Sequence, residues 1–180
     1  MRTFIAINFD EDVKKYIQSV SGRIKENCKK GNFVDESNYH LTVRFIGEVD
    51  KEEIGNICLA MDEALSSIKS FKLTLRGIGF FKRGYKSIVW VGLQDSKILN
   101  IAHSRLEKSL QKQGFSRDRQ GLSPHITLAR EAELKKGYDE IKKEIGFQEK
   151  EISVSSIALM ESKRIGSKLV YTPIYVKKLK

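Results

Sequence analysis

The stretch that decides the fold is PHITLAR at residues 124–130, because a closely similar stretch, YHLTVRF, stands at residues 39–45. Each contains a histidine, an apolar residue, a threonine and a second apolar residue. The chain has three histidines, and two of them, His40 and His125, open this pattern. Either two strands resemble each other by chance, or the molecule has two matching half-sites.

The two motifs belong to a longer repeat with a constant offset. His40 and His125 are 85 positions apart, and Asp10 and Asp95 are separated by the same 85 positions. The stretches that align without a gap are FIAINFD (4–10) and VWVGLQD (89–95). The strands that close each half match only with gaps. Gene duplication is the simplest explanation, and it predicts one domain over residues 1–180 built from two related lobes.

Apolar periodicity predicts the elements of each half. In the first half we expect a strand at 4–9, a helix from 10 to about 29, a loop at 31–38, the His40 strand, a helix from about 50, and strands at 71–81 and 87–94. In the second half we expect a helix from 95 to 114, a loop, the His125 strand, a helix at 132–145, and strands at 151–162 and 169–179. The helical stripes are Val13, Ile17, Val20 and Ile24; Ile54, Ile57, Met61, Leu65 and Ile68; and Ile98, Ile101, Leu106 and Leu110.

The formal net charge of the chain is +10 at pH 7. A basic surplus favours polyanionic partners, because phosphates gain attraction and release counterions. A lysine-rich, solvated surface explains the same charge, so charge alone leaves both interpretations open. Basic residues on the predicted turns, which are candidates for guiding a polynucleotide, stand at positions 82, 83, 86, 163, 164 and 168.

Nothing in the sequence indicates a membrane or an oxidising compartment. No apolar run approaches the roughly 18 residues that a membrane span needs. Residues 1–9, MRTFIAINF, are typical of a first strand rather than a signal peptide. Cys28 and Cys58 lie on separate predicted helices without metal-binding spacing, which indicates idle thiols. We therefore expect a cytoplasmic protein.

Strand geometry groups the side chains of each motif. Because side chains alternate between faces, His40, Thr42 and Arg44 are predicted to share one face. Leu41, Val43 and Phe45 would then point into the core. In the second motif His125 and Thr127 share a face. Arg130 is five positions from His125, so strict alternation places it on the wrong face unless the strand ends or bulges.

Two imidazoles, two hydroxyls and a guanidinium suit in-line displacement at phosphorus. The reaction needs a base on one side and an acid on the other, and histidine, with a free pKa of about 6.5, serves as either near neutral pH. The hydroxyls of Thr42 and Thr127 can donate to phosphate oxygens, and Arg44 or Arg130 can offset the growing charge.

Other uses of these residues fit less well. A catalytic zinc needs three protein ligands, and neither histidine strand brings a carboxylate or a cysteine at ligand spacing. Ser123 precedes the second motif without an acidic partner or a nucleophile elbow. His103 has no threonine two places on, and we expect it on a helix surface. The sequence therefore favours acid–base catalysis without a metal or cofactor.

At these residues the sequence resembles the two-histidine (2H) phosphoesterases, and within them the RNA 2′,3′-cyclic phosphodiesterases, also called 2′–5′ RNA ligases. The resemblance covers essentially the whole chain. It rests on MRTFIAINF, on HLTVRFIGEV, on HITLAR, and on a C-terminal segment with Leu159, Ser162 and Tyr171.

The resemblance implies an α+β, bilobal, pseudo-twofold fold in which two antiparallel β-sheets face a central groove, with helices on the outside. It implies hydrolysis of a terminal 2′,3′-cyclic phosphate to a 2′-phosphomonoester. His125 would activate water, His40 would protonate the leaving oxygen, and Thr42, Thr127 and Arg130 would hold the phosphate. Ligation would be the same chemistry in reverse.

The partner implied is an RNA with a 2′,3′-cyclic phosphate end, tRNA fragments among the candidates, and the protein is expected to be a monomer without an obligate protein partner. Two alternatives remain open at this point. One is a 2H activity on a small cyclic or 2′–5′-linked nucleotide. The other is a non-catalytic module that binds RNA or a nucleotide.

Overall fold

The computed structural model describes all 180 residues and contains two antiparallel β-sheets. The strands are β1 (Arg2–Asn8), β2 (Cys28–Phe33), β3 (His40–Glu48), β4 (Phe71–Arg83), β5 (Lys86–Leu93), β6 (His125–Leu134), β7 (Lys150–Val154), β8 (Ser156–Ile165) and β9 (Lys168–Lys178). The helices are α1 (Glu11–Glu26), α2 (Lys51–Leu65), α3 (Lys97–Lys112) and α4 (Tyr138–Ile145), with a 3-10 turn at Glu36–Asn38. Sheet A has the strand order β3-β1-β8-β9, and sheet B has the order β2-β6-β5-β4-β7. The predicted α+β class with two antiparallel sheets is confirmed.

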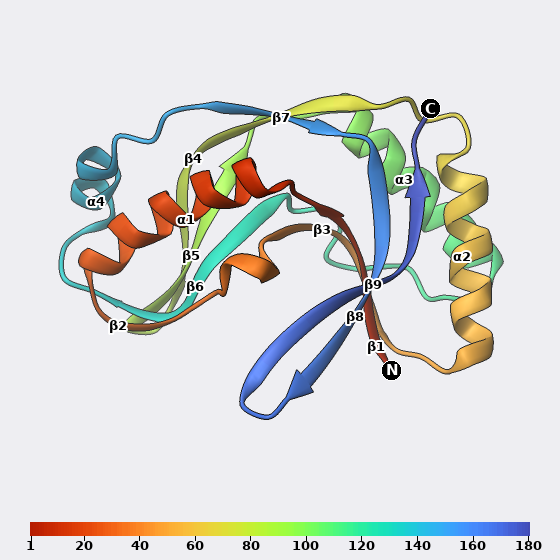
Figure 1. Cartoon of the computed structure of the whole chain (residues 1–180), viewed down its shortest axis with the longest axis horizontal. Helices are drawn as coiled ribbons and strands as arrows, with labels where there is room; N and C mark the ends of the chain where they lie inside the picture. Colours follow the sequence, from red (N-terminus) through yellow and green to blue (C-terminus); the bar gives the residue numbers. More distant parts are fainter.

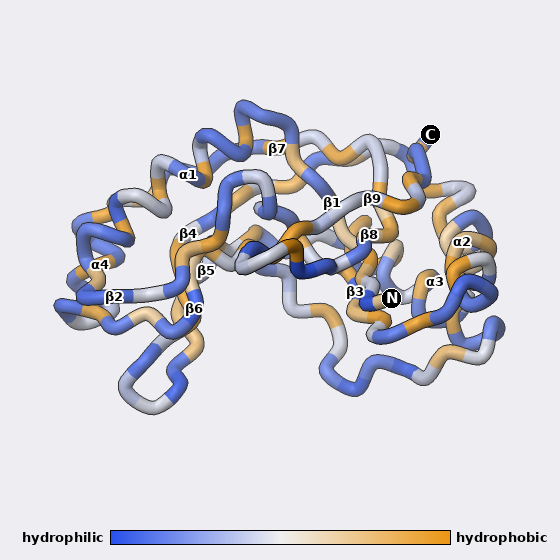
Figure 2. Tube along the Cα trace, turned by 60° about the horizontal axis from the view of Figure 1, so that its bottom comes forward, coloured by the Kyte–Doolittle hydropathy of each residue, from blue (hydrophilic) through white to orange (hydrophobic).

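The helices lie on the outside of the sheets. In Figure 1, α1 and α4 accompany sheet B, while α2 and α3 pack together beside sheet A. Hydrophobic and hydrophilic residues alternate along α1 (Figure 2), as expected for a helix with one buried face. Its predicted stripe is buried, and so is the α2 stripe apart from the half-buried Ile54. Most buried apolar side chains of the two sheets form one core, and Phe4, Ala6, Ala158 and Met160 form a separate small cluster on sheet A.

The helix starts follow from the sequence. The side chain of Asp10 accepts a hydrogen bond from the Val13 amide at 2.9 Å and so begins α1. Asp50 and Glu53 form a reciprocal capping box at the start of α2. These caps fix where each helix leaves the strand before it.

Two strands were missed because the chain changes sheets. The predicted strand at 151–162 is two strands: β7 pairs with β4 in sheet B, and β8 pairs with β1 in sheet A. The predicted loop at 31–38 begins inside β2, which pairs with β6 although it precedes the His40 strand. The expected helix therefore ends at Glu26, and Cys28 is the first residue of β2 rather than a helical residue.

Two helix predictions need correction. The helix predicted at 132–145 is α4 alone, because β6 continues to Leu134. In α3, Ile98 and Ile101 are exposed rather than buried. The inward stripe is instead Leu99, Ala102, Leu106 and Leu110. The cap of α3 is Ser96, not Asp95, so the helix phase differs from the one predicted. None of the four helices combines the length and apolar character needed to cross a membrane.

Candidate active site

His40 and His125 are held in the same way at the first residue of their strands. His40 Nδ1 is 2.7 Å from the carbonyl oxygen of Asn38, and His125 Nδ1 is 2.7 Å from the carbonyl oxygen of Ser123. Because a carbonyl oxygen only accepts, Nδ1 must carry the proton in both rings. Nε2 is therefore the nitrogen that is free to exchange a proton when the ring is neutral.

A β-bulge follows the threonine of each motif. In the β1–β3 ladder, Ala6 pairs with Thr42 and Ile5 with Arg44, which leaves Val43 as an extra residue. In the β5–β6 ladder, Trp90 pairs with Thr127 and Val89 with Ala129, which leaves Leu128 as the extra residue. An extra residue reverses the alternation of faces beyond it. The fifth residue after each histidine therefore returns to the histidine side.

Arg130 is one of the two residues that the bulges bring back to the histidine side. Its predicted place beside the histidines required such a bulge. Its positive charge lowers the pKa of His40 and the pKa of His125. Burial raises the pKa of Tyr171 on β9, and the charge of Arg130 opposes that rise. A charge that acts on all three groups lies where the two sheets meet, and β3 and β6 are in contact there.

Arg44 is not beside the histidines, contrary to the prediction. The bulge turns it to the opposite face of sheet A, where its side chain is buried and forms an ion pair with Glu107 on α3. Its Nη2 also donates to the carbonyl oxygen of Ser116 at 2.6 Å. The guanidinium is thus engaged within the protein rather than available to a phosphate. Phe45, predicted to be in the core, is 59% exposed for the same reason.

Aromatic rings surround both histidines. Phe4 and Tyr171 lie 4.8 and 5.0 Å from His40 between ring centroids, and Tyr171 meets it edge-on. Phe81 lies 5.3 Å from His125, perpendicular to it, and packs on Trp90 at 5.0 Å. These contacts orient the imidazoles and remove water from their sides.

Burial is the main influence on both imidazoles. Loss of water lowers the pKa of His40 and the pKa of His125 below the ordinary value of 6.5. The hydrogen bonds to the Asn38 and Ser123 carbonyls oppose this shift, and the charge of Arg130 adds to it. The charge of His125 also lowers the pKa of His40, so the two rings are electrostatically coupled.

The remaining predicted residues are placed as follows. Thr42 Oγ1 is 3.0 Å from His40 Nε2, and Thr127 is half-buried on β6 two residues after His125. His103, expected on a helix surface, is half-buried on α3, and its Nε2 is buried without a partner. The charges that act on His103 are those of Glu107, Asp118 and Arg44, so it belongs to the surroundings of the Arg44 ion pair.

Several neighbours of the histidines were not predicted from the sequence: Phe4, Phe81, Trp90, Asn38 and Ser123. A signal existed for the last two, because both precede a motif histidine by two positions and keep the 85-residue offset. The aromatic residues carried no such signal, because each lies on a strand that is distant in the sequence from the histidine it contacts.

A family model described as the 2′-5′ RNA ligase superfamily matches residues 9–166. The chain belongs to this superfamily. A relative in Thermotoga maritima, named RNA 2′,3′-cyclic phosphodiesterase, is 30% identical over 97% of this chain and 94% of its own length. A protein of the same name in Methanothermobacter thermautotrophicus is 26% identical over 99% of both chains.

Two solved structures share this architecture. The crystal structure of E. coli LigT complexed with 3′-AMP matches with a TM-score of 0.80 and 25% identity, over 99% of this chain and 97% of that chain. TT0787 of Thermus thermophilus matches with a TM-score of 0.79 and 22% identity, over 99% of this chain and 98% of that chain, which concerns the fold alone.

Proposed function

We propose that this protein is an RNA 2′,3′-cyclic phosphodiesterase that hydrolyses the terminal cyclic phosphate to a 2′-phosphomonoester. The observation that carries the proposal is the matched pair of imidazoles, each with Nδ1 fixed by a main-chain carbonyl, so that Nε2 is the nitrogen left to exchange a proton; Nε2 of His40 contacts only the hydroxyl of Thr42. The names of the relatives in Thermotoga maritima and Methanothermobacter thermautotrophicus support the same reaction.

In the proposed reaction, His125 Nε2 takes a proton from water as the water oxygen attacks phosphorus. The bond from phosphorus to O3′ breaks, and His40 donates its Nε2 proton to O3′. The assignment of acid and base follows the resemblance to the 2H family. The bound cyclic phosphate is anionic and raises the pKa of a nearby imidazole, so it offsets the effect of burial and favours a protonated His40.

Thr42, Thr127 and Arg130 are proposed to bind the non-bridging oxygens. Both hydroxyls lie on the histidine side of their strands, and the bulge brings Arg130 to that side. Arg44 takes no part in this proposal, because its guanidinium is paired with Glu107. The exposed ring of Phe45, on the same face as His40, is available to stack on the terminal base.

The proposed hydrolysis needs no metal. Proton transfer is assigned to the imidazoles and charge stabilisation to Arg130, so each step of the proposed reaction has a side chain to perform it. Ligation would use the same attack with an RNA 5′-hydroxyl in place of water: the bond from phosphorus to O3′ breaks, O3′ takes a proton, and a 2′–5′ phosphodiester forms. We propose further that the two lobes arose by duplication, since both histidines, both carbonyls and both bulges keep one offset.

The test compares wild type with His40→Ala and His125→Ala on a short RNA that ends in a 2′,3′-cyclic phosphate. Each substitution should lower kcat by roughly 10²–10⁴-fold while the RNA still binds. His103→Ala is the matched control, because it removes the third histidine outside the site, and it should stay within a few-fold of wild type. A wild-type protein that binds the RNA and leaves it unchanged would indicate a binding module instead.

A further inference from the structure

The face of sheet A that carries His40 continues onto the β8–β9 hairpin. Phe4 pairs with Met160 across β1 and β8, and Ser162 pairs with Tyr171 across β8 and β9. These side chains lie on the His40 side, as the contact between Phe4 and Tyr171 shows. Arg164 lies two residues beyond Ser162, and strand alternation therefore places it on the same side.

Arg2 lies on this face as well. It precedes Phe4 by two residues on β1, so alternation gives the two side chains the same face. Burial raises the pKa of Tyr171, and the positive charge of Arg2 opposes that rise, which agrees with a position on the same face. Arg2 and Arg164 are exposed, and neither forms an ion pair. Arg164 donates only to the carbonyl oxygen of Ser167, at 3.2 Å.

The guanidiniums of Arg2 and Arg164 lie farther along this face than the place proposed for the reacting phosphate. Tyr171 touches His40, and Arg164 is two strand residues, about 7 Å, farther along the hairpin. The hairpin extends out from the body of the molecule in Figure 1. A ligand that enters the site at His40 and continues as a chain of phosphates would therefore pass along Arg2 and Arg164. Guanidiniums bind phosphate groups with two parallel hydrogen bonds, which suits such a chain.

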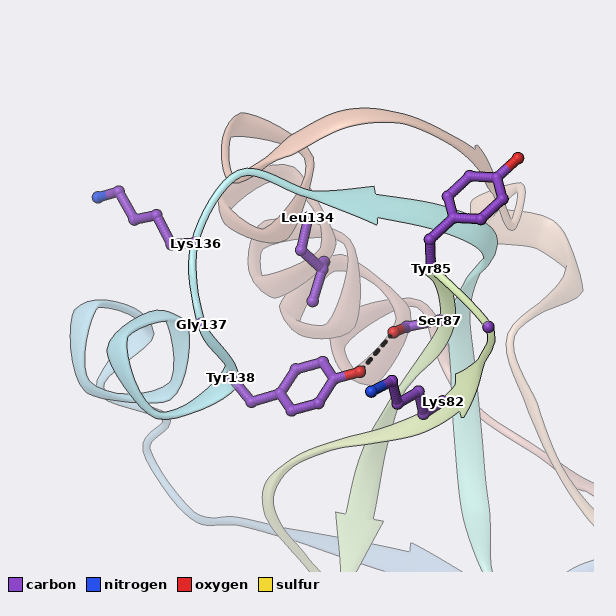
Figure 3. Close-up of a pocket in the computed structure, with 8 residues that line it drawn as sticks. Lys82, Tyr85, Ser87, Leu134, Lys136, Gly137 and Tyr138 are labelled. Carbon is purple, nitrogen blue, oxygen red and sulfur yellow. Dashed lines mark hydrogen bonds between the residues drawn. The ribbon is translucent and has the colours of Figure 1, made fainter.

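Beside a second basic turn, between β4 and β5, two lysines are already paired within the protein. Figure 3 shows the cavity beside it, of about 260 Å³, with Tyr85 and Tyr138 in its lining. Lys86 is paired with Glu131, and Lys136, across the cavity, is paired with two glutamates. Phe81, on the strand that leads into this turn, lies 5.3 Å from His125, so the turn belongs to the side of the other histidine.

We propose that Arg2 and Arg164 bind backbone phosphates of the RNA upstream of its terminal nucleotide, and so give an oligonucleotide an advantage over a mononucleotide. The inference rests on the proposed function, because it takes the cyclic phosphate to lie at His40. The protein would then recognise the polynucleotide chain as well as its end group.

The test uses a double variant, Arg2→Gln with Arg164→Gln, and two substrates: a short RNA with a 2′,3′-cyclic phosphate end, and a 2′,3′-cyclic mononucleotide. We expect kcat/KM for the RNA to fall roughly ten-fold, since two charge-assisted contacts are lost, while kcat/KM for the mononucleotide stays unchanged. The slope of log affinity for the RNA against log salt should become less steep by about 1.4. Each phosphate contact on a single strand contributes roughly 0.7 to this slope, and two contacts are lost.

The matched control is Lys163→Gln with Lys168→Gln. These lysines belong to the same hairpin but, by the β8–β9 register, lie on its opposite face. The control removes the same two charges and should leave kcat/KM for the RNA within about two-fold of wild type. An equal loss in both double variants would overturn the proposal, because it would show an effect of net charge alone. An equal loss on both substrates would also overturn it.

Binding separates this inference from the proposed function. The affinity of each variant for a labelled RNA that ends in a 2′-phosphate is measured by fluorescence anisotropy, which requires no turnover. If wild type turns over neither substrate, the proposed function fails. A weaker affinity confined to the Arg2 and Arg164 variant would still support the upstream contacts, and unchanged affinity would refute them.

Discussion

Arg44 on β3 and Glu107 on α3 form a buried ion pair that also holds the segment leading to His125. Glu107 Oε2 accepts a hydrogen bond from the Asp118 amide at 3.0 Å, and Arg44 donates to the Ser116 carbonyl. One pair thus joins the His40 strand, a helix and the segment before the other histidine. The pair assembles the site without belonging to it.

Removing one partner of this pair should destabilise the fold. Glu107→Leu leaves the Arg44 guanidinium buried and uncompensated, which costs about 3–5 kcal/mol of the free energy of unfolding. The double variant Arg44→Met with Glu107→Leu should be markedly more stable than Glu107→Leu alone, as measured by urea denaturation. KM for the RNA should be unchanged in the double variant. A large rise in KM with native stability would instead make Arg44 a phosphate ligand.

The pH dependence of kcat/KM should be bell-shaped and centred below pH 6.5. The centre of such a bell is the mean of the two pKa values of the free enzyme, and burial lowers the pKa of both His40 and His125 from 6.5. Measurement of kcat/KM between pH 4.5 and pH 8.5, a span of about two units on each side of that value, gives the centre directly. A flat profile would argue against histidine acid–base catalysis.

Neutralising Arg130 should move that bell to higher pH. Its positive charge lowers the pKa of both histidines, so Arg130→Gln lets both pKa values rise. Arg130→Lys keeps the charge and should keep the bell in place. Both variants should lower kcat/KM, because the bidentate contact with phosphate is lost. A pH profile of kcat/KM with the same centre in Arg130→Gln as in wild type would show that the charge of Arg130 does not act on the histidines.

Gly79 on β4 is predicted to be intolerant of alanine. A Cβ there would overlap the ring of Trp90, which packs on Phe81 beside His125. Gly79→Ala should therefore lower kcat at least ten-fold and destabilise the protein by about 1–3 kcal/mol. Trp90→Phe in the same chain shortens the ring system and should restore part of both losses. No rescue of kcat would mean that the Trp90 position does not control His125.

Asn38 couples the β8–β9 hairpin to His40. Its main-chain carbonyl oxygen accepts from His40. Its side-chain Nδ2 donates to the Leu169 carbonyl at 2.7 Å, and its side-chain Oδ1 accepts from the Tyr171 amide at 3.3 Å. Asn38→Ala should speed hydrogen exchange at the Tyr171 amide and lower kcat several-fold. Ser123→Ala is the control at the equivalent position, where only the main-chain carbonyl is used. Similar exchange at Tyr171 in both variants would contradict the coupling.

The sequence predicted correctly that each histidine shares a strand face with its threonine, because both residues precede the bulge. From His40 to Thr42 the strand alternates regularly, so the period of two is sufficient. After Thr42 the extra residue Val43 exchanges the faces of Arg44 and Phe45, and a bulge is set by pairing with β1 rather than by the local pattern. The equivalent extra residue in β6, Leu128, brings Arg130 to the histidine side.

The elements that were mispredicted depend on distant partners. The segment CKKGNF of β2 is polar and contains a glycine, and only its pairing with β6 makes it a strand. The division between β7 and β8 falls at Ser155, where the chain passes from sheet B to sheet A without a glycine or proline. By contrast, α1 was predicted correctly at its start, because Asp10 and a regular apolar stripe are local signals.

The most direct test of the central claim is the identity of the product. Wild-type protein is mixed, in excess EDTA, with a short RNA that ends in a 2′,3′-cyclic phosphate, and the new terminus is assigned by mass and by phosphatase sensitivity. We predict complete conversion to a 2′-phosphate, with one water added and no metal required. A 3′-phosphate product, or an RNA recovered unchanged, would contradict the account.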